Sequence, residues 1–281
     1  ASDWSSDVCS SDLTHETSVM NSSAWREVEA KYQGEIVALG LSIGQSRTFY
    51  DLYGKILAAL PEGDSVRRRI MECALRDAKL SGVALEGRAR ERFNEIQSEL
   101  SRLATDFSNT VLDATKVFKL PVPKEEASSL DGLSAHIKDM IANPGGDGWT
   151  LTIEDAVYVP AMKHLKSSAL RERLYRARCS RAPENTPRIA RILDLKREMA
   201  EILGYGSFAE VSLATKCAPG VAAVMEMIEE IASAAKPARE REDAALERFA
   251  GRKIAPWDRA FYAVPNVVNP ASYSAVDSLT M

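Results

Sequence analysis

The feature that most constrains the fold is one long amphipathic run between Arg88 and Thr115. Its apolar residues recur at intervals of three and four, which places them on one face of an α-helix; they are Phe93, Ile96, Leu100, Leu103, Phe107, Val111 and Ala114. Such a run is typical of a coiled-coil surface or of a helix packed within its own domain. Because the flanking heptad positions carry no ordered charges, we favour a helix packed within its own domain.

The same spacing predicts helices along most of the N-terminal half. One apolar face runs from Trp25 to Ile43, and a second runs from Phe49 to Leu60. Asp64 is a suitable N-cap for the next helix, which extends to about Leu80. These segments indicate several helices of unequal length rather than a regular repeat.

The last third of the chain is predicted to be helical again. Thr186 is expected to cap a helix with a buried apolar stripe formed by Ile189, Ile192, Leu193, Met199, Ile202 and Leu203. Ser207 and Glu210 have the spacing of a capping box, in which each side chain bonds to a free backbone amide. A further helix follows Pro219 through Val221, Val224, Met225, Ile228 and Ile231, and Pro237 predicts a kink or break in it.

Residues 116–152 have a different character, because the prolines at 121 and 123 exclude a continuing helix. We expect a short helix from Ser129 to Ala142, a turn over 143–148 and a strand over 149–153. The predicted fold class is therefore mainly α: an irregular helical bundle, with a possible short β-hairpin near 117–153.

Composition excludes several classes of partner. The net charge of −4 gives no basic footprint, so nucleic acid is not an expected partner. No stretch reaches the roughly 18 consecutive apolar residues of a membrane-spanning helix, so no membrane association is expected. The four cysteines are widely spaced without a C-x-x-C pair, which favours free thiols in a reducing compartment.

No catalytic motif is complete in this sequence. His15 and Glu16 begin an H-E-x-x-H pattern, but the second ligand position holds Val19, and His136 and His164 stand alone. The glycines of 203–208 fit a joint between helices better than a phosphate cradle, because a helix precedes them. We therefore assign no catalytic residue and no metal ligand, and leave the substrate-binding residues unknown.

Four segments, in order, carry a resemblance to a known family. They are residues 72–82 (ECALRDAKLSG), residues 92–115 with the ending SNTVLDAT, residues 202–215 (ILGYGSFAEVSLAT) and residues 256–262 (PWDRAFY). Together these segments resemble the thimet oligopeptidase and oligopeptidase A family of zinc metallopeptidases. The resemblance covers residues 14–262 and implies a neurolysin-like bundle with two lobes beside a deep channel.

In that family the H-E-x-x-H zinc motif follows the P-W-D element at some distance, so the resemblance implies an N-terminal fragment that lacks the zinc site. The expected organisation is a leader of non-native appearance at 1–13, in which Ser-Asp occurs three times, and an N-terminal helical lobe at 14–150. The start of the peptidase region would follow at 151–262, with a divergent tail at 263–281.

The function implied by the resemblance is that of a metalloendopeptidase, a protease that hydrolyses short peptides. We expect zinc in the complete protein and none in this fragment, which is predicted to be inactive on its own. The complete protein is expected to be a cytoplasmic or organellar monomer. The alternative is a catalytically silent helical scaffold or peptide-binding protein, and the native reading frame beyond residue 262 distinguishes the two.

Overall fold

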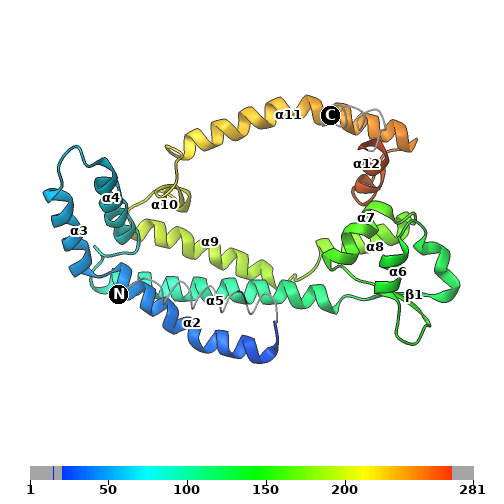
Figure 1. The fold of residues 1–281 in the computed structure, drawn as a ribbon, viewed down its shortest axis with the longest axis horizontal. Helices are drawn as coiled ribbons and strands as arrows, with labels where there is room; N and C mark the ends of the chain where they lie inside the picture. Colours follow the sequence, from blue (N-terminus) through cyan, green and yellow to red (C-terminus); the bar gives the residue numbers. More distant parts are fainter. Residues whose placement is uncertain (1–14, 16–20, 268–281) are drawn as a thin grey trace, which may run out of the picture. The chain divides into compact units, whose positions relative to one another are not determined.

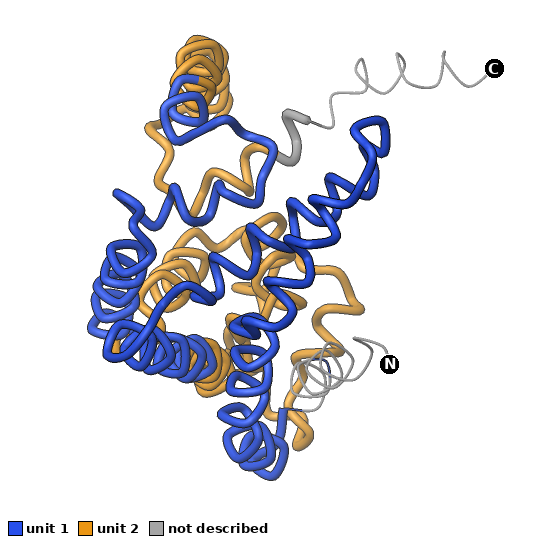
Figure 2. Tube along the Cα trace, turned by 90° about the vertical axis from the view of Figure 1, so that its left-hand side faces the viewer, with its two compact units in different colours: residues 1–107, 185–226 blue, residues 108–184, 227–281 orange. Residues whose placement is uncertain are grey.

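The computed structural model describes residue 15 and residues 21–267, which fall into two compact units. Figure 1 shows the helices, and Figure 2 colours the units. The first unit takes the residues up to Phe107 together with Asn185–Glu226, and the second takes Ser108–Glu184 and the residues from Met227 onward. Each unit is therefore built from segments that are far apart in the sequence, and the predicted mainly helical fold class is confirmed.

The first unit is built from helices of unequal length. Its elements are α2 (Ser23–Gly44), α3 (Arg47–Ala59), α4 (Ser65–Leu80), the first part of α5 (Gly87–Val117), α9 (Asn185–Ile202), α10 (Phe208–Leu213) and the start of α11 (Val221–Ala250). Asp64 caps α4 as predicted, because its side chain accepts a hydrogen bond from the Arg67 amide. Arg68 ties α4 to α3 by donating to the Leu57 and Leu60 carbonyls.

Helix α5 lies at the centre of the first unit and packs within its own domain, as we favoured. Its buried residues Phe93, Ile96 and Leu103 form one core with Leu195 and Met199 of α9. Side-chain bonds pair the start of α5 with the end of α9, so the two helices run antiparallel.

The predicted buried stripe of α9 is partly wrong. Met199 is buried, but Ile189 and Leu193 are 46% and 60% exposed. Leu195 and Ala200 are buried although the prediction omitted them. Since successive residues are about 100° apart around a helix, Ile189 and Leu193 lie a quarter-turn or more from the face that α5 covers.

The two ends of α9 test the predicted cap at Thr186 and the predicted joint at 203–208. The helix begins at Asn185, so Thr186 lies inside it and is not the cap. Gly204 follows the last turn with a φ of 81°, a left-handed conformation that glycine adopts without strain. The capping box of α10 is confirmed for Ser207, which accepts from the Glu210 amide, while the Glu210 carboxylate accepts from the Gly206 amide.

The second unit combines a small sheet with short helices. Its elements are the end of α5, β1 (Leu120–Pro123), the 3-10 helix η1 (Lys124–Leu130), α6 (Ala135–Ile141), β2 (Gly148–Leu151), α7 (Asp155–His164), α8 (Ser168–Cys179), most of α11, the 3-10 turn η2 (Pro256–Asp258) and α12 (Arg259–Val267). Strands β1 and β2 pair antiparallel, with Leu120 opposite Leu151, so the expected hairpin is confirmed.

The helix predicted over Ser129–Ala142 is shorter than expected. Helix α6 begins only at Ala135, after a break at Gly132. Gly132 has a φ of 97°, and a Cβ atom there would lie 1.9 Å from the His164 carbonyl oxygen. A side chain cannot fit at this contact, so the chain turns where the periodicity suggested a continuous helix.

The core of the second unit is formed by the hairpin, α6, α7 and α8. Its buried apolar residues are Leu120, Val122, Leu130, Leu133, Ile141, Leu151, Ile153, Val157, Ala161, Met162, Leu165, Leu170 and Leu174. Trp257 and Ala260, which lie about ninety residues further along the chain, pack against this core.

Helix α11 continues through Pro237 to Ala250, so the predicted break is wrong. Proline removes one backbone hydrogen bond and crowds the carbonyl four residues earlier. All side chains from Met225 to Pro237 are exposed, so water can reach the carbonyl that loses its partner. The predicted leader at 1–13 and most of the tail at 263–281 lie outside the described residues.

Candidate functional site

The histidines singled out in the sequence do not come together. His15, His136 and His164 are all exposed, and the latter two lie on different helices, α6 and α7. Within residue 15 and residues 21–267, no three His, Cys, Asp or Glu side chains form a group that could hold a metal ion. The glycines at 204 and 206 lie in the joint between α9 and α10, as predicted.

The most elaborate polar site is formed by the Pro256–Tyr262 element of the resemblance. Trp257 packs against Tyr175 of α8 with ring centroids 6.1 Å apart. One turn earlier on the same helix, the Arg171 guanidinium lies 4.1 Å from the centroid of the Phe261 ring. Asp258 lies between these contacts and is fully buried. The motif therefore docks η2 and α12 onto α8.

Asp258 is the centre of this docked element. Its Oδ1 accepts from the Ser168 hydroxyl at 2.7 Å and from Arg171 Nε at 3.2 Å, and Arg252 donates to Oδ2. Arg171 is 1% exposed. Its Nη2 also donates to Asp258 Oδ1, and its Nη1 donates to the Leu165 carbonyl. Every polar atom of this network that points inward has a partner, as a buried charge requires.

The electrostatics follow from this geometry. Burial raises the pKa of Asp258, but hydrogen bonds from Ser168, Arg171 and Arg252 lower it by more. The net pKa lies below the ordinary value of 3.8, so the carboxylate is ionised at neutral pH. The Asp258 carboxylate in turn raises the pKa of Arg252. A carboxylate held by two cations in this way serves as an anchor and not as a proton donor.

Sequence reasoning missed the partners of Asp258, although one signal was available. Arg171 lies beside Leu170 and three residues before Leu174, both of which are buried. A charged residue on the apolar face of an amphipathic helix indicates a buried ion pair. The sequence does not say which carboxylate, 87 residues away, completes that pair.

In the first unit, two charged pairs join α5 to α9. Arg92 donates to both carboxylate oxygens of Glu198, at 2.6 and 2.8 Å, and Arg191 binds Glu99 in the same way at 2.7 and 2.8 Å. These two-pronged pairs lower the pKa of each carboxyl group through the arginine hydrogen bonds. Their side chains stay a quarter to nearly half exposed.

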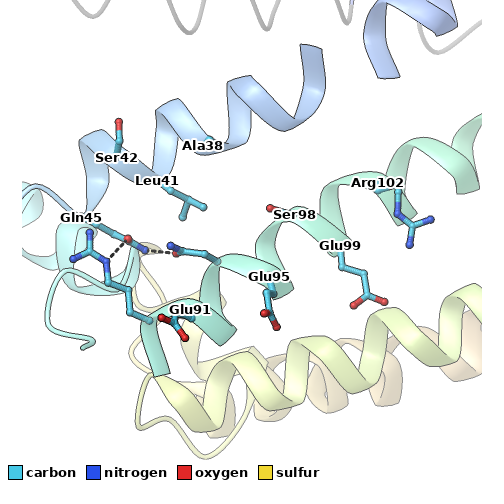
Figure 3. Close-up of a pocket in the computed structure, with 11 residues that line it drawn as sticks. Ala38, Leu41, Ser42, Gln45, Glu91, Glu95, Ser98, Glu99 and Arg102 are labelled. Carbon is cyan, nitrogen blue, oxygen red and sulfur yellow. Dashed lines mark hydrogen bonds between the residues drawn. The ribbon is translucent and has the colours of Figure 1, made fainter. Parts of the chain in front are cut away.

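An open groove runs between α2 and α5 in the first unit, and Figure 3 shows the side chains along it. Its volume is about 970 Å³, and its lining comprises Ala38, Leu41, Ser42, Gln45, Arg90, Glu91, Asn94, Glu95, Ser98, Glu99 and Arg102. Three glutamates, at 91, 95 and 99, follow one another at intervals of one helical turn. Arg90 and Arg102 line the same groove, and Glu95 and Glu99 are paired with Arg92 and Arg191, so the lining carries little net charge.

One end of this groove is lined by Gln45, which is 3% exposed. Its amide nitrogen donates to the Ser81 carbonyl at 2.9 Å and to Asn94 at 2.7 Å, and its oxygen accepts from Arg90 at 2.9 Å. Figure 3 shows two of the hydrogen bonds of Gln45 as dashed lines. Because these bonds satisfy Gln45 internally, its role in the groove is structural.

A smaller depression of about 700 Å³ lies in the second unit, beside the SNTVLDAT segment. Thr110, Asp113 and Ala114 of α5 line it opposite the 180–184 loop. Ala182 in this loop has a φ of 55°, which is uncommon for a residue with a side chain. The SNTVLDAT segment thus packs beside a tight turn.

Two family models match this chain. The model described as Peptidase family M3 matches residues 161–279, and the one described as Neurolysin/Thimet oligopeptidase, N-terminal domain, matches residues 7–90. Both matches run past the borders predicted at residues 13 and 262, and those borders stay predictions. No helix within residues 21–267 has the length and apolar character needed to cross a membrane.

Curated relatives agree with these family models. The chain is 35% identical to the probable cytosolic oligopeptidase A of Arabidopsis thaliana over 89% of its own length and 39% of the relative's. It is also 35% identical to the organellar oligopeptidase A, chloroplastic/mitochondrial, of the same plant, over 89% of this chain and 34% of the relative. It is 32% identical to the oligopeptidase A of Haemophilus influenzae, over 90% of this chain and 40% of the relative. The chain therefore spans about two fifths or less of these relatives.

The structure defines a mainly helical protein in which the P-W-D element of the resemblance serves packing. The family follows from two findings: the order of the two matched regions, and the 35% identity to an oligopeptidase A over 89% of the chain. The chain belongs to peptidase family M3, the thimet oligopeptidase family.

Proposed function

We propose that this chain is the N-terminal part of a zinc-dependent metallo-oligopeptidase that hydrolyses short peptides. The observation that carries the proposal is the 35% identity to an oligopeptidase A over 89% of the chain. The order of the family matches, N-terminal domain first and peptidase region second, supports it. By the same resemblance, residues 14–150 form the N-terminal lobe and residues 151–262 begin the peptidase region.

Zinc does not fit the residues that the structure describes. The histidines are exposed and separate, and no group of three potential ligands exists within residues 21–267. We therefore assign no zinc ligand and no catalytic residue to this chain. The zinc site is proposed to belong to the portion of the relatives' length that this chain does not span.

The proposed contribution of this chain is to wall a channel that only extended peptides can enter. A folded protein would have to unfold first, at a cost of about 5–15 kcal/mol. The complete protein is proposed to be a monomer with short peptides as substrates. Its compartment is proposed to be cytosolic or organellar, in line with the names of the two plant relatives.

The test starts from the native reading frame beyond Tyr262. If that frame continues into an H-E-x-x-H motif, the longer protein should be expressed. It should cleave a quenched fluorescent peptide in a chelator-sensitive way, and it should barely cleave a folded protein such as native lysozyme. Replacing the glutamate of that motif with glutamine should abolish turnover while zinc stays bound. Equal rates on short peptides and folded proteins would overturn the proposal.

A second candidate is a catalytically silent scaffold that binds peptides. The observation that favours it is the open groove between α2 and α5. In that case the native reading frame would end without a zinc motif, and a fluorescent peptide would bind this chain. Leu41→Glu, which places a charge on an apolar residue of the lining, should then weaken the binding.

A further inference from the structure

In the second unit, the end of α11 and the element that follows it fold against each other. Asp243 of α11 is paired with Arg259 of α12, and the Phe249 ring meets the Tyr262 ring edge-on, with centroids 6.3 Å apart. These contacts make residues 243–262 one body, which we call the docking segment.

The docking segment adds no residue to the buried core of the second unit. The buried apolar residues of that core all come from residues 120–174, and Trp257 and Ala260 of the docking segment pack against them while staying half-buried. Helix α12 lies against α7 (Figure 1), and η2 lies against α8. On its other side the segment continues into residues 225–237 of α11, where every side chain is exposed. The core therefore buries its apolar side chains among themselves, and the docking segment is added to its outside.

The contact between the docking segment and α8 is polar at its centre. Asp258 and Arg171 are buried, the Ser168 hydroxyl donates to Asp258, and the Trp257 ring packs against Tyr175. A desolvated charge pair beside aromatic anchors is typical of an interface between two folded bodies, where Trp, Tyr and Arg are enriched. Each of these polar groups regains water when the contact opens, so opening leaves no buried ion behind.

We propose that the docking segment detaches from α7 and α8 as one body while the core at 120–174 stays folded. The α8 face that it uncovers, with Ser168, Arg171 and Tyr175, is a binding face for a peptide that carries the P-W-D sequence, and the docking segment is its resident ligand. The carboxylate gives the specificity, because a docked peptide without it would bury Arg171 as an uncompensated ion. Detachment also frees the end of α11 without unfolding the core.

Hydrogen exchange, followed by mass spectrometry of the 281-residue chain, tests the detachment. In the unsubstituted chain, the helical amides of 243–262 should exchange faster than those of 120–174, because the docking segment opens while the core stays closed. Asp258→Asn should speed exchange in 243–262 by at least about tenfold and leave the core amides unchanged. Equal rates in the two regions, or loss of protection in the core together with the docking segment, would overturn the proposal.

The matched control is Asp243→Asn, the same substitution at an ion pair that water reaches. The side chains of Asp243 and Arg259 are 33% and 50% exposed. Because exposed pairs contribute little, exchange in the docking segment should change by at most about threefold. An effect as large as that of Asp258→Asn would contradict a docking contact centred on the buried pair.

A peptide supplied separately tests the binding face. A fluorescent synthetic peptide with the sequence of residues 252–262 should bind the Asp258→Asn chain, whose own docking segment has left α8. It should bind the unsubstituted chain at least about tenfold more weakly, because the face is occupied there. The same peptide carrying Asp258→Asn should bind neither chain. Fluorescence anisotropy measures these affinities, and equal binding to the two chains, or no binding of the native peptide to the Asp258→Asn chain, would refute the binding face.

Discussion

The two units hold their distant segments together with the same kinds of side chain in opposite environments. In the second unit, Asp258 and Arg171 are 0% and 1% exposed. In the first, Arg92 and Glu198 are 34% and 38% exposed although they form a two-pronged pair. Both pairs join residues about a hundred positions apart. Short ion-pair distances alone therefore do not identify the contacts on which the stability of a unit depends.

The physical reason is the solvent around each pair. Water screens the exposed pair and solvates either partner if the other is lost, so its net contribution is small. A buried charge has no such replacement, and losing its partner leaves an uncompensated ion in the core. The P-W-D element is therefore expected to be the sensitive point of the second unit.

The largest effect is expected for Asp258→Ala, which leaves Arg171 buried without its anion. It should lower the free energy of unfolding by about 3–5 kcal/mol, measured by urea denaturation with tryptophan fluorescence. The matched control is Asp243→Ala, which removes an aspartate whose partners Arg259 and Arg239 are half or more exposed. Equal losses in the two variants would remove the distinction between buried and exposed pairs.

The pH dependence of stability should reveal the same anchor. The folded-state pKa of Asp258 lies below the ordinary value of 3.8, so its contribution is fully present above that pH. The contribution is lost as pH falls from about 4 through the lower folded-state pKa. Urea unfolding at several acidic pH values should therefore show a steeper decline for the parent chain than for Asp258→Asn. Parallel declines would contradict this assignment.

An intermediate effect is expected for Gln45→Ala in the first unit. The substitution removes the acceptor of Arg90 and the donor to Ser81 and Asn94. Because these groups are partly buried, stability should fall by about 1–3 kcal/mol. Gln33→Ala within α2 is the comparison, since Gln33 is only half-buried and bonds Ser101 and Thr105. A larger loss for Gln33→Ala would reverse the expected order.

The smallest effect is expected for the exposed pairs between α5 and α9. Glu198→Gln and Glu99→Gln should each lower stability by about 0.2–1 kcal/mol, because water and salt screen these contacts. The loss should shrink further at high ionic strength in thermal unfolding experiments. A salt-independent loss as large as that of Asp258→Ala would mean that these pairs carry the register of the two helices.

Local sequence signals predicted the parts of the fold that depend on neighbours along the chain. The Arg88–Thr115 period predicted α5, and Asp64 and Ser207 were found to cap their helices. These signals succeed because a cap or an amphipathic face involves residues within a few turns. The β-hairpin was also predicted, since prolines and turn residues bound both strands.

Features that depend on packing between distant segments could not be predicted from the sequence. Ile189 and Leu193 of α9 fit an apolar stripe, but which face of a helix is covered depends on where α5 lies. The partner of Asp258 could not be predicted because Arg171 lies 87 residues earlier. The sequence similarity pointed to residues 256–262 before their packing role was visible. For the candidate site, local patterns thus located the motif but not its contacts.

The most direct test of the account is whether this 281-residue chain performs peptidase chemistry by itself. The chain should be dialysed against chelator-free buffer, its zinc content measured by elemental analysis, and its activity followed on a quenched fluorescent peptide with and without a chelator. We expect substoichiometric zinc and no chelator-sensitive cleavage, because the family motifs of this chain build packing contacts in the described residues. One zinc ion per chain together with chelator-sensitive cleavage would contradict it.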